Sequence, residues 1–159
     1  MRDRFRKLTA LLAALLLCYG VAAIGGLLGA RSGARWYADL EKPPWTPPAW
    51  VFGPVWMVLY GMMAAAVWLV WLQRRRRRAA PIVAFGVQLA LNAAWTPLFF
   101  GLGRVDLALI DIVLLLPALA VTVWLFFRHR AVAGLLLVPY LLWAGFAAAL
   151  NFAIWRLNA

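Results

Sequence analysis

Acidic residues are scarce in this 159-residue chain, which holds 5 Asp and Glu against 16 Lys and Arg and has a formal net charge of +11. Charged residues make up only 13% of the sequence, whereas hydrophobic residues make up 67%. A soluble domain of this size needs a polar surface, and this composition cannot supply one. The sequence therefore predicts that much of the protein surface faces lipid.

Cysteine and histidine are almost absent, with one residue of each. Cys18 has no partner for an intrachain disulfide. His129 lies in "RHR" without a second ligand nearby, so we expect a solvated loop residue rather than a metal or haem ligand. "GLLG" at residues 26–29 lies inside a hydrophobic run, which argues against nucleotide binding. The sequence predicts no metal and no cofactor.

Long uncharged or nearly uncharged segments separate the charged residues, and each is long enough to cross a bilayer, which takes about 20 residues. The predicted spans are residues 8–30, 49–73, 80–101, 105–127 and 132–156. The start of the chain also resembles a signal peptide, but its hydrophobic run continues to Ala30, so we expect a retained first span. The prediction is an all-α integral membrane protein, a single domain over residues 1–159 with a five-transmembrane-helix bundle.

Basic residues are unevenly divided between the two ends of these spans. The N-terminus and the loops after the second and fourth spans share one side and hold 11 of the 16 basic residues, including the run Arg74–Arg78. The positive-inside rule then predicts a cytoplasmic N-terminus. The run has no interleaved aromatic residues, so we expect it to meet anionic lipid headgroups rather than nucleic acid.

The segment 31–47, which contains "KPPWTPP", is predicted to be the longest non-helical part of the chain. Proline fixes φ and restricts the preceding residue, so a stiff, extended loop is expected. Such a loop suits a cap over a pocket. Trp45 and Trp50 fit this role and an interfacial aromatic belt equally well.

Aromatic and polar residues recur at helical spacing on one face of three predicted spans. These faces hold Phe52, Trp56 and Tyr60; Gln88, Asn92, Trp95 and Phe99; and Pro139, Trp143, Ala147, Asn151 and Trp155. An amide is costly in hydrocarbon unless it is paired, so Gln88 and Asn92 should face the bundle. If the faces converge beneath the loop, they form a mostly apolar pocket with few polar groups, the usual form of a small-molecule site.

Asp111 is predicted to lie inside the bilayer, about a turn and a half into the fourth span. An unpaired carboxylate there costs about 2.5–3.5 kcal/mol on insertion scales, so we expect Asp111 to be protonated or partnered. Asn92 is the candidate partner. A structural hydrogen bond is favoured over ligand contact or proton transfer.

Four motifs together resemble the TspO/MBR family of translocator proteins, also called peripheral-type benzodiazepine receptors. They are "WYADLEKPPWTPPAWVFGPVWMVLY", "LNAAWTPLFFG", "ALIDIVLLLP" and "PYLLWAGFAAALNFAIWRLN", and the resemblance covers about residues 10–158. It implies a five-helix bundle whose first loop covers a pocket. Family members bind porphyrins such as protoporphyrin IX and isoquinoline or benzodiazepine-type drugs, and mitochondrial members also bind cholesterol.

The resemblance also implies particular residues. By position in the motifs, the ligand-binding residues would be Tyr37, Pro47, Trp56, Tyr60, Asn92, Trp95, Trp143 and Ala147. In some bacterial members the tryptophans matching Trp56 and Trp143 are implicated in light-dependent porphyrin breakdown. Homodimers are common in the family, and Gly86-xxx-Ala90-xxx-Ala94 offers a close-packing surface. Phe152 replaces the tyrosine of the sterol-recognition pattern, although Arg156 is kept, so we predict no dedicated sterol site.

The leading hypothesis is a tryptophan-rich sensory or translocator protein of a bacterial cell membrane that binds tetrapyrroles in their regulation, transport or a stress response. Arg35 or Lys42 would meet the porphyrin carboxylates. The alternative is an enzyme that degrades porphyrin in light; no acid–base pair is visible, and the residues leave this question open. A plain transporter is disfavoured because five spans contain no paired repeat.

Overall fold

The computed structural model describes residues 1–32, 34–73 and 79–159 of the chain. Its helices are α1 (Arg2–Ser32), α2 (Ala34–Asp39), α3 (Ala49–Trp71), α4 (Ala79–Thr96), the π-helix η1 (Pro97–Gly101), α5 (Val105–His129) and α6 (Ala131–Asn158). Five helical stretches of the described chain are long and apolar enough to span a membrane: α1, α3, α4 continued by η1, α5 and α6. The predicted five-helix membrane protein is confirmed.

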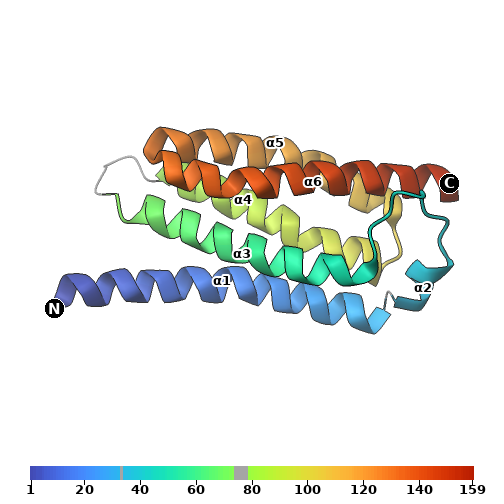
Figure 1. Ribbon diagram of the computed structural model, residues 1–159, viewed down its shortest axis with the longest axis horizontal. Helices are drawn as coiled ribbons and strands as arrows, with labels where there is room; N and C mark the ends of the chain where they lie inside the picture. Colours follow the sequence, from blue (N-terminus) through green and yellow to red (C-terminus); the bar gives the residue numbers. More distant parts are fainter. Residues whose placement is uncertain (33, 74–78) are drawn as a thin grey trace.

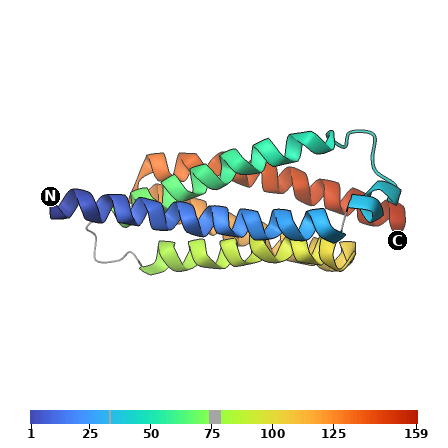
Figure 2. The ribbon, with the colours of Figure 1, turned by 90° about the horizontal axis from the view of Figure 1, so that it is seen from below.

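The five long helices run side by side along the long axis of the molecule (Figures 1 and 2). Within the bundle α1 packs on α3, α3 on α6, α4 on α5 and α5 on α6. The N-terminus lies at one end of the bundle, whereas α2 and the C-terminus lie at the other (Figure 1). Residues 36–48 therefore meet the C-terminal end of α6. The predicted cap can cover this end of the bundle.

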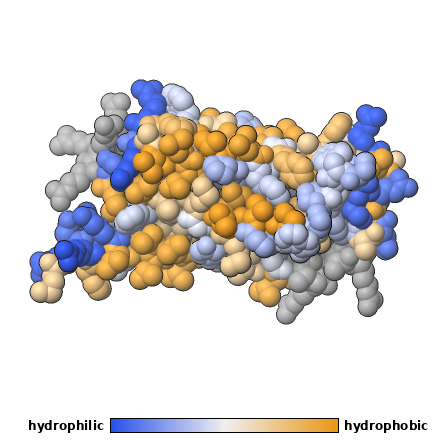
Figure 3. All heavy atoms as spheres, in the orientation of Figure 1, coloured by the Kyte–Doolittle hydropathy of each residue, from blue (hydrophilic) through white to orange (hydrophobic). Residues whose placement is uncertain are grey.

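The bundle surface matches a lipid environment. Hydrophobic residues dominate the middle of the face shown in Figure 3, and hydrophilic residues gather at its two ends. Large apolar side chains such as Leu16, Ile110 and Leu142 are exposed along three different helices. In water this would be an aggregation-prone surface, but in a bilayer it is the favoured one.

The prediction that residues 31–47 are non-helical is partly wrong, because residues 34–39 form α2. The stretch "ARWYAD" contains neither proline nor glycine, so nothing in it prevents a helical turn. The proline-rich part is also not fully extended. The backbone N–H and the hydroxyl of Thr46 donate to the Pro43 carbonyl at 3.0 and 2.7 Å, which closes a turn. We call residues 36–48 the lid.

Basic residues of the described chain gather at the N-terminal end. The Arg6 guanidinium lies 5.5 Å from the centre of the Trp71 ring, and that of Arg128 lies 5.0 Å from the centre of the Trp124 ring. The arginine run 74–78 lies outside the described residues.

His129 is not the solvated loop residue that we predicted. It is the last residue of α5, and its Nδ1 lies 2.9 Å from the Leu125 carbonyl oxygen. Basic residues suit a helix C-terminus, so the helix continues through "RH".

Candidate ligand site

The two tryptophans singled out for photochemistry face the interior of the bundle. Trp56 of α3 contacts Tyr60 and Tyr140, with ring centroids 5.6 and 6.0 Å apart. Trp143 of α6 contacts Phe52 and Phe146, at 5.8 and 5.3 Å. Both tryptophans are half-buried and pack against the central hydrophobic core. We call these residues (Phe52, Trp56, Tyr60, Tyr140, Trp143 and Phe146) the inner cluster.

Asn92 joins this cluster from α4. The Tyr60 hydroxyl donates a hydrogen bond to Asn92 Oδ1 at 2.5 Å, and both side chains are buried. The predicted pairing of Asn92 with Asp111 is therefore wrong: the amide oxygen is taken by Tyr60, and Asp111 Oδ2 has no hydrogen-bond partner among the described residues. The prediction that Gln88 and Asn92 face the bundle is confirmed, because both are buried.

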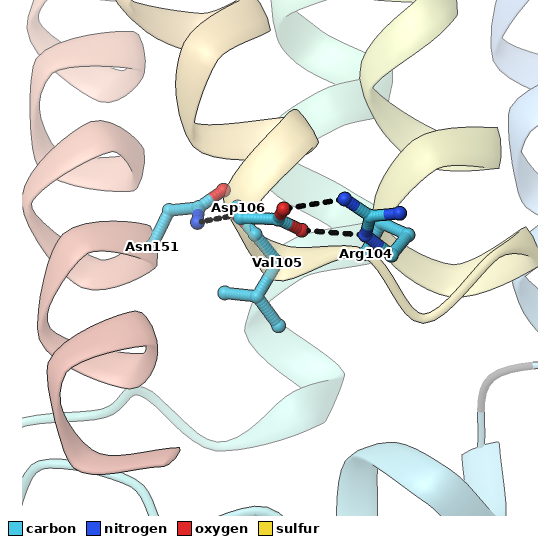
Figure 4. A network of polar contacts seen from close by, with 4 residues as sticks. All are labelled: Arg104, Val105, Asp106 and Asn151. Carbon is cyan, nitrogen blue, oxygen red and sulfur yellow. Dashed lines mark hydrogen bonds and ion pairs between the residues drawn. The ribbon is translucent and has the colours of Figure 1, made fainter. Parts of the chain in front are cut away.

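Trp95 is held by an amide from α6. Its indole Nε1 donates to Asn151 Oδ1 at 3.0 Å. Asn151 Nδ2 in turn donates to the Val105 carbonyl at 3.0 Å (Figure 4). Asn151 is 1% exposed, so both of its hydrogen bonds are shielded from water. It thereby connects α4, α5 and α6. The sequence placed Asn151 on the aromatic face of α6 but gave it no role; its spacing of four from Ala147 was the available signal.

A second aromatic group lies beneath the lid. Trp95 stacks on Phe99 of η1 with ring centroids 4.8 Å apart. Tyr37 of the lid contacts the same Phe99 at 6.0 Å and Phe100 at 5.6 Å. The π-helix presents both phenylalanines to these partners, which agrees with the frequent occurrence of such wide turns at functional sites. Burial raises the pKa of the Tyr37 hydroxyl, so this group is neutral.

Tyr37 and Pro47, the two lid residues that the resemblance implied, line the same open cavity of about 450 Å³. Its remaining lining residues are Ala38, Lys42, Thr46 and Ala49. The two residues therefore lie together, at the end of the bundle where α2 folds back. Ala147 is half-buried on α6, one turn from Trp143.

Lys42 lines this cavity and also holds the backbone of its own segment, so its expected contact with a ligand carboxylate stays a prediction. Its Nζ donates to the carbonyls of Tyr37, Ala38 and Leu40 at 2.7, 3.1 and 2.7 Å. An ammonium group has three donors, so all of them are in use. The ammonium also lies 4.8 Å from the centre of the Tyr37 ring. Lys42 therefore closes the C-terminal end of α2, and the Arg35 side chain lies outside the described residues.

The lid is tied to the end of α6 by Asn158. The Glu41 N–H donates to Asn158 Oδ1 at 3.0 Å, and Asn158 Nδ2 donates to the Glu41 carbonyl at 2.9 Å. The same Nδ2 donates to the Ile154 carbonyl at 2.8 Å, which fixes the side chain against its own helix. The amide thus pairs with the lid backbone as a neighbouring strand would.

Replacing Asn158 with leucine removes these hydrogen bonds at similar side-chain size. We expect amide hydrogen exchange in residues 40–46 to become about tenfold faster, since two hydrogen bonds of about 0.5–1.5 kcal/mol each are lost. Exchange measured by mass spectrometry checks this, with Arg156→Gln as the matched control, because Arg156 is exposed at the same helix end and makes none of these bonds. Equal exchange in N158L and the parent protein would contradict the role of Asn158.

These features define a class: a multi-pass helical membrane protein whose spanning helices bring aromatic rings and a few amides together at a capped end. The chain belongs to the TspO/MBR family, whose family model matches residues 14–156. The family resemblance seen in the four sequence motifs is confirmed.

Curated relatives agree with this assignment. The chain is 41% identical to the translocator protein of Homo sapiens over 143 residues, 86% of this chain and 85% of the relative. It is 40% identical to the tryptophan-rich protein TspO of Archaeoglobus fulgidus over 149 residues, 94% and 97% of the two chains. It is also 40% identical to the tryptophan-rich sensory protein of Cereibacter sphaeroides over 144 residues, 91% and 88% of the two chains.

Proposed function

We propose that this protein binds a flat tetrapyrrole such as protoporphyrin IX between α3, α4 and α6 beneath the lid, and that it acts in tetrapyrrole regulation, transport or a stress response. The observation that carries the proposal is the inward orientation of Trp56, Trp95 and Trp143, which come from three different spanning helices. Large planar rings with few polar neighbours favour a planar, largely apolar ligand. The same rings suit isoquinoline or benzodiazepine-type molecules.

The polar atoms of the inner cluster support this choice. Trp143 Nε1 is buried and has no hydrogen-bond partner among the described residues. An indole nitrogen is only a donor, so it favours a ligand with an acceptor atom at that position. The rings now contact each other at 5–6 Å. A macrocycle would enter by replacing these ring–ring contacts with its own faces, and the lid would then close the site.

Titration of protoporphyrin IX against tryptophan fluorescence tests the proposal. We expect the double variant Trp56→Phe, Trp143→Phe to bind at least about tenfold more weakly, because indoles at the centre of a site contribute several times more than peripheral contacts. The matched control is Trp124→Phe, which removes an exposed indole from the outer face of α5 and should leave the affinity unchanged. Unchanged affinity in the double variant would contradict the proposal.

Light-dependent porphyrin breakdown is the second candidate function, favoured by the inward position of both Trp56 and Trp143. An indole in contact with an excited macrocycle can donate an electron, with dioxygen as the final oxidant. Illumination should then produce a bilin-like absorption band with repeated turnover, and the band should be lost in Trp143→Phe. Bleaching of one porphyrin per protein without turnover would support binding alone.

For the topology we propose a cytoplasmic N-terminus in a bacterial cell membrane, since most basic residues belong to the N-terminal end of the bundle. The lid would then face the outer side of that membrane.

We also propose a homodimer that forms through α4. A Cβ added at Gly86 would meet no atom within 4 Å, and Ala90 is exposed on the same face, so this surface is open to a second copy.

A further inference from the structure

Three buried polar side chains other than Trp143 have atoms without hydrogen-bond partners in the described part of the chain. They are Gln88 of α4, with both amide atoms, Asp111 of α5, with Oδ2, and Tyr140 of α6, with its hydroxyl. Gln88 and Tyr140 are 0% exposed and Asp111 is 7% exposed. Unpaired polar groups at this depth are rare, and each needs a partner that the protein does not itself supply.

These groups belong to one region of the bundle. The Tyr140 hydroxyl lies near the Asp111 carboxyl and beside the Asn92 amide, but its contact with Asn92 does not have the geometry of a hydrogen bond. Gln88 precedes Asn92 by one helical turn, so the two amides share one face of α4. Asp111 lies six residues into α5, about 9 Å from its start, which places it well inside the hydrocarbon layer.

No basic group faces the Asp111 carboxyl among the described residues. The titratable groups near Tyr140 are Asp111, Tyr60 from α3 and Cys18 from α1, and none of them is a basic residue. Arg104, the nearest basic residue along the chain, holds Asp106 with two hydrogen bonds of 2.8 and 2.6 Å (Figure 4). An ionised carboxylate that is buried without a cation is strongly disfavoured, so Asp111 is the neutral acid.

A neutral carboxylic acid is a donor as well as an acceptor, and it needs an acceptor for its proton. Tyr140 and Gln88 offer oxygen atoms but make no direct hydrogen bond to it. An internal water is stable when it has about two to four polar partners, and the unpaired atoms of these three side chains offer that number.

We propose that Asp111, Tyr140 and Gln88 form a hydrated proton-binding site in the middle of the bundle, in which a protonated Asp111 shares internal water with the tyrosine hydroxyl and the glutamine amide. The ligand class is water together with a single exchangeable proton. The site adjoins the aromatic ligand site through Tyr140, whose ring belongs to the inner cluster, but it needs no porphyrin.

Infrared spectroscopy of the purified protein in lipid nanodiscs, without added ligand, tests the proposal. The chain has only five acidic residues, and the other four, Asp3, Asp39, Glu41 and Asp106, are exposed or half-exposed, so Asp111 is the buried carboxyl among them. We expect one carbonyl stretch of a protonated carboxylic acid at neutral pH, because burial without a cation favours the neutral form. It should disappear in Asp111→Asn and remain in the control Asp106→Asn. Absence of the band in the parent protein at neutral pH would overturn the proposal.

The shared water is tested separately, on variants that keep Asp111. Tyr140→Phe and Gln88→Leu should each shift the carboxylic-acid band, because each removes a partner of the water. An O–H stretch that moves in oxygen-isotope-labelled water should change in the same two variants. A carboxyl band that is identical in the parent protein and both variants would show that the three groups share no site. The first measurement is made on the parent protein, so the test does not depend on whether D111N folds. A negative infrared result would say nothing about porphyrin binding, which the titration tests separately.

Discussion

Replacing Asn151 with alanine is expected to destabilise the protein more than any other single loss of an amide. The substitution leaves the Trp95 Nε1 donor and the Val105 carbonyl acceptor without their partner, and Asn151 is 1% exposed. A buried group that loses its only partner costs about 1–3 kcal/mol, so we expect a loss of about 2–4 kcal/mol in the free energy of unfolding. Thermal unfolding in detergent or nanodiscs measures it.

A double-mutant cycle separates this effect from the loss of side-chain volume. In the Trp95→Phe background the indole donor is already gone, so Asn151→Ala should cost less there than in the parent protein. We also expect the freed Trp95 ring to move on Phe99, which would weaken porphyrin binding and change the tryptophan emission. Equal costs of N151A in both backgrounds would show that the hydrogen bond between Trp95 and Asn151 contributes nothing to stability.

Gly134→Ala is expected to have the second large effect, at the turn between α5 and α6. A Cβ at this buried position would overlap the ring of Phe127, lying 2.5 Å from Cδ2 and 2.7 Å from Cδ1. The ring must leave its place or the two helices must separate. Overpacking of this kind costs about 1–3 kcal/mol. A lower midpoint in thermal unfolding, with unchanged helix content by circular dichroism, is the expected result.

Two further variants test whether the overlap with Phe127 causes the effect of Gly134→Ala. Gly145→Ala adds the same methyl group to the same helix where no atom lies within 4 Å, so it should be neutral or slightly stabilising. Phe127→Ala removes the ring that causes the overlap, so adding it to Gly134→Ala should recover much of the loss. If G134A and G145A unfold at the same temperature, close approach of the two helices is not what the glycine provides.

Much of the architecture could be predicted from local features of the sequence. The five spans follow from uncharged segments longer than the hydrocarbon layer, and the structure moves their ends by only a few residues, except at Arg2, where α1 begins six residues early. Burial of Gln88 and Asn92 followed from the cost of an amide in lipid. These predictions succeeded because lipid penalises each exposed polar group separately, whatever the rest of the chain does.

Predictions about pairs of residues succeeded less often. Asn92 pairs with Tyr60 instead of Asp111, and the sequence did not indicate that Lys42 binds the backbone of its own segment. Asn151 and Asn158 received no role, although one holds Trp95 and the other holds the lid. Each of these partners lies on another helix or on the carbonyl end of α2, and periodicity along one helix contains no information about the rotation of its neighbours.

The sequence by itself determined that this protein is a five-helix membrane bundle of the TspO/MBR family, because hydrophobic length and motif order are properties of the chain alone. Only the tertiary structure decided which amide meets which ring, that residues 34–39 are helical, and that Asp111 Oδ2 has no hydrogen-bond partner among the described residues. The physical reason is that a hydrogen bond depends on the distance and angle between two groups. Helix packing sets both, and it places groups side by side that are as far apart in the chain as Glu41 and Asn158.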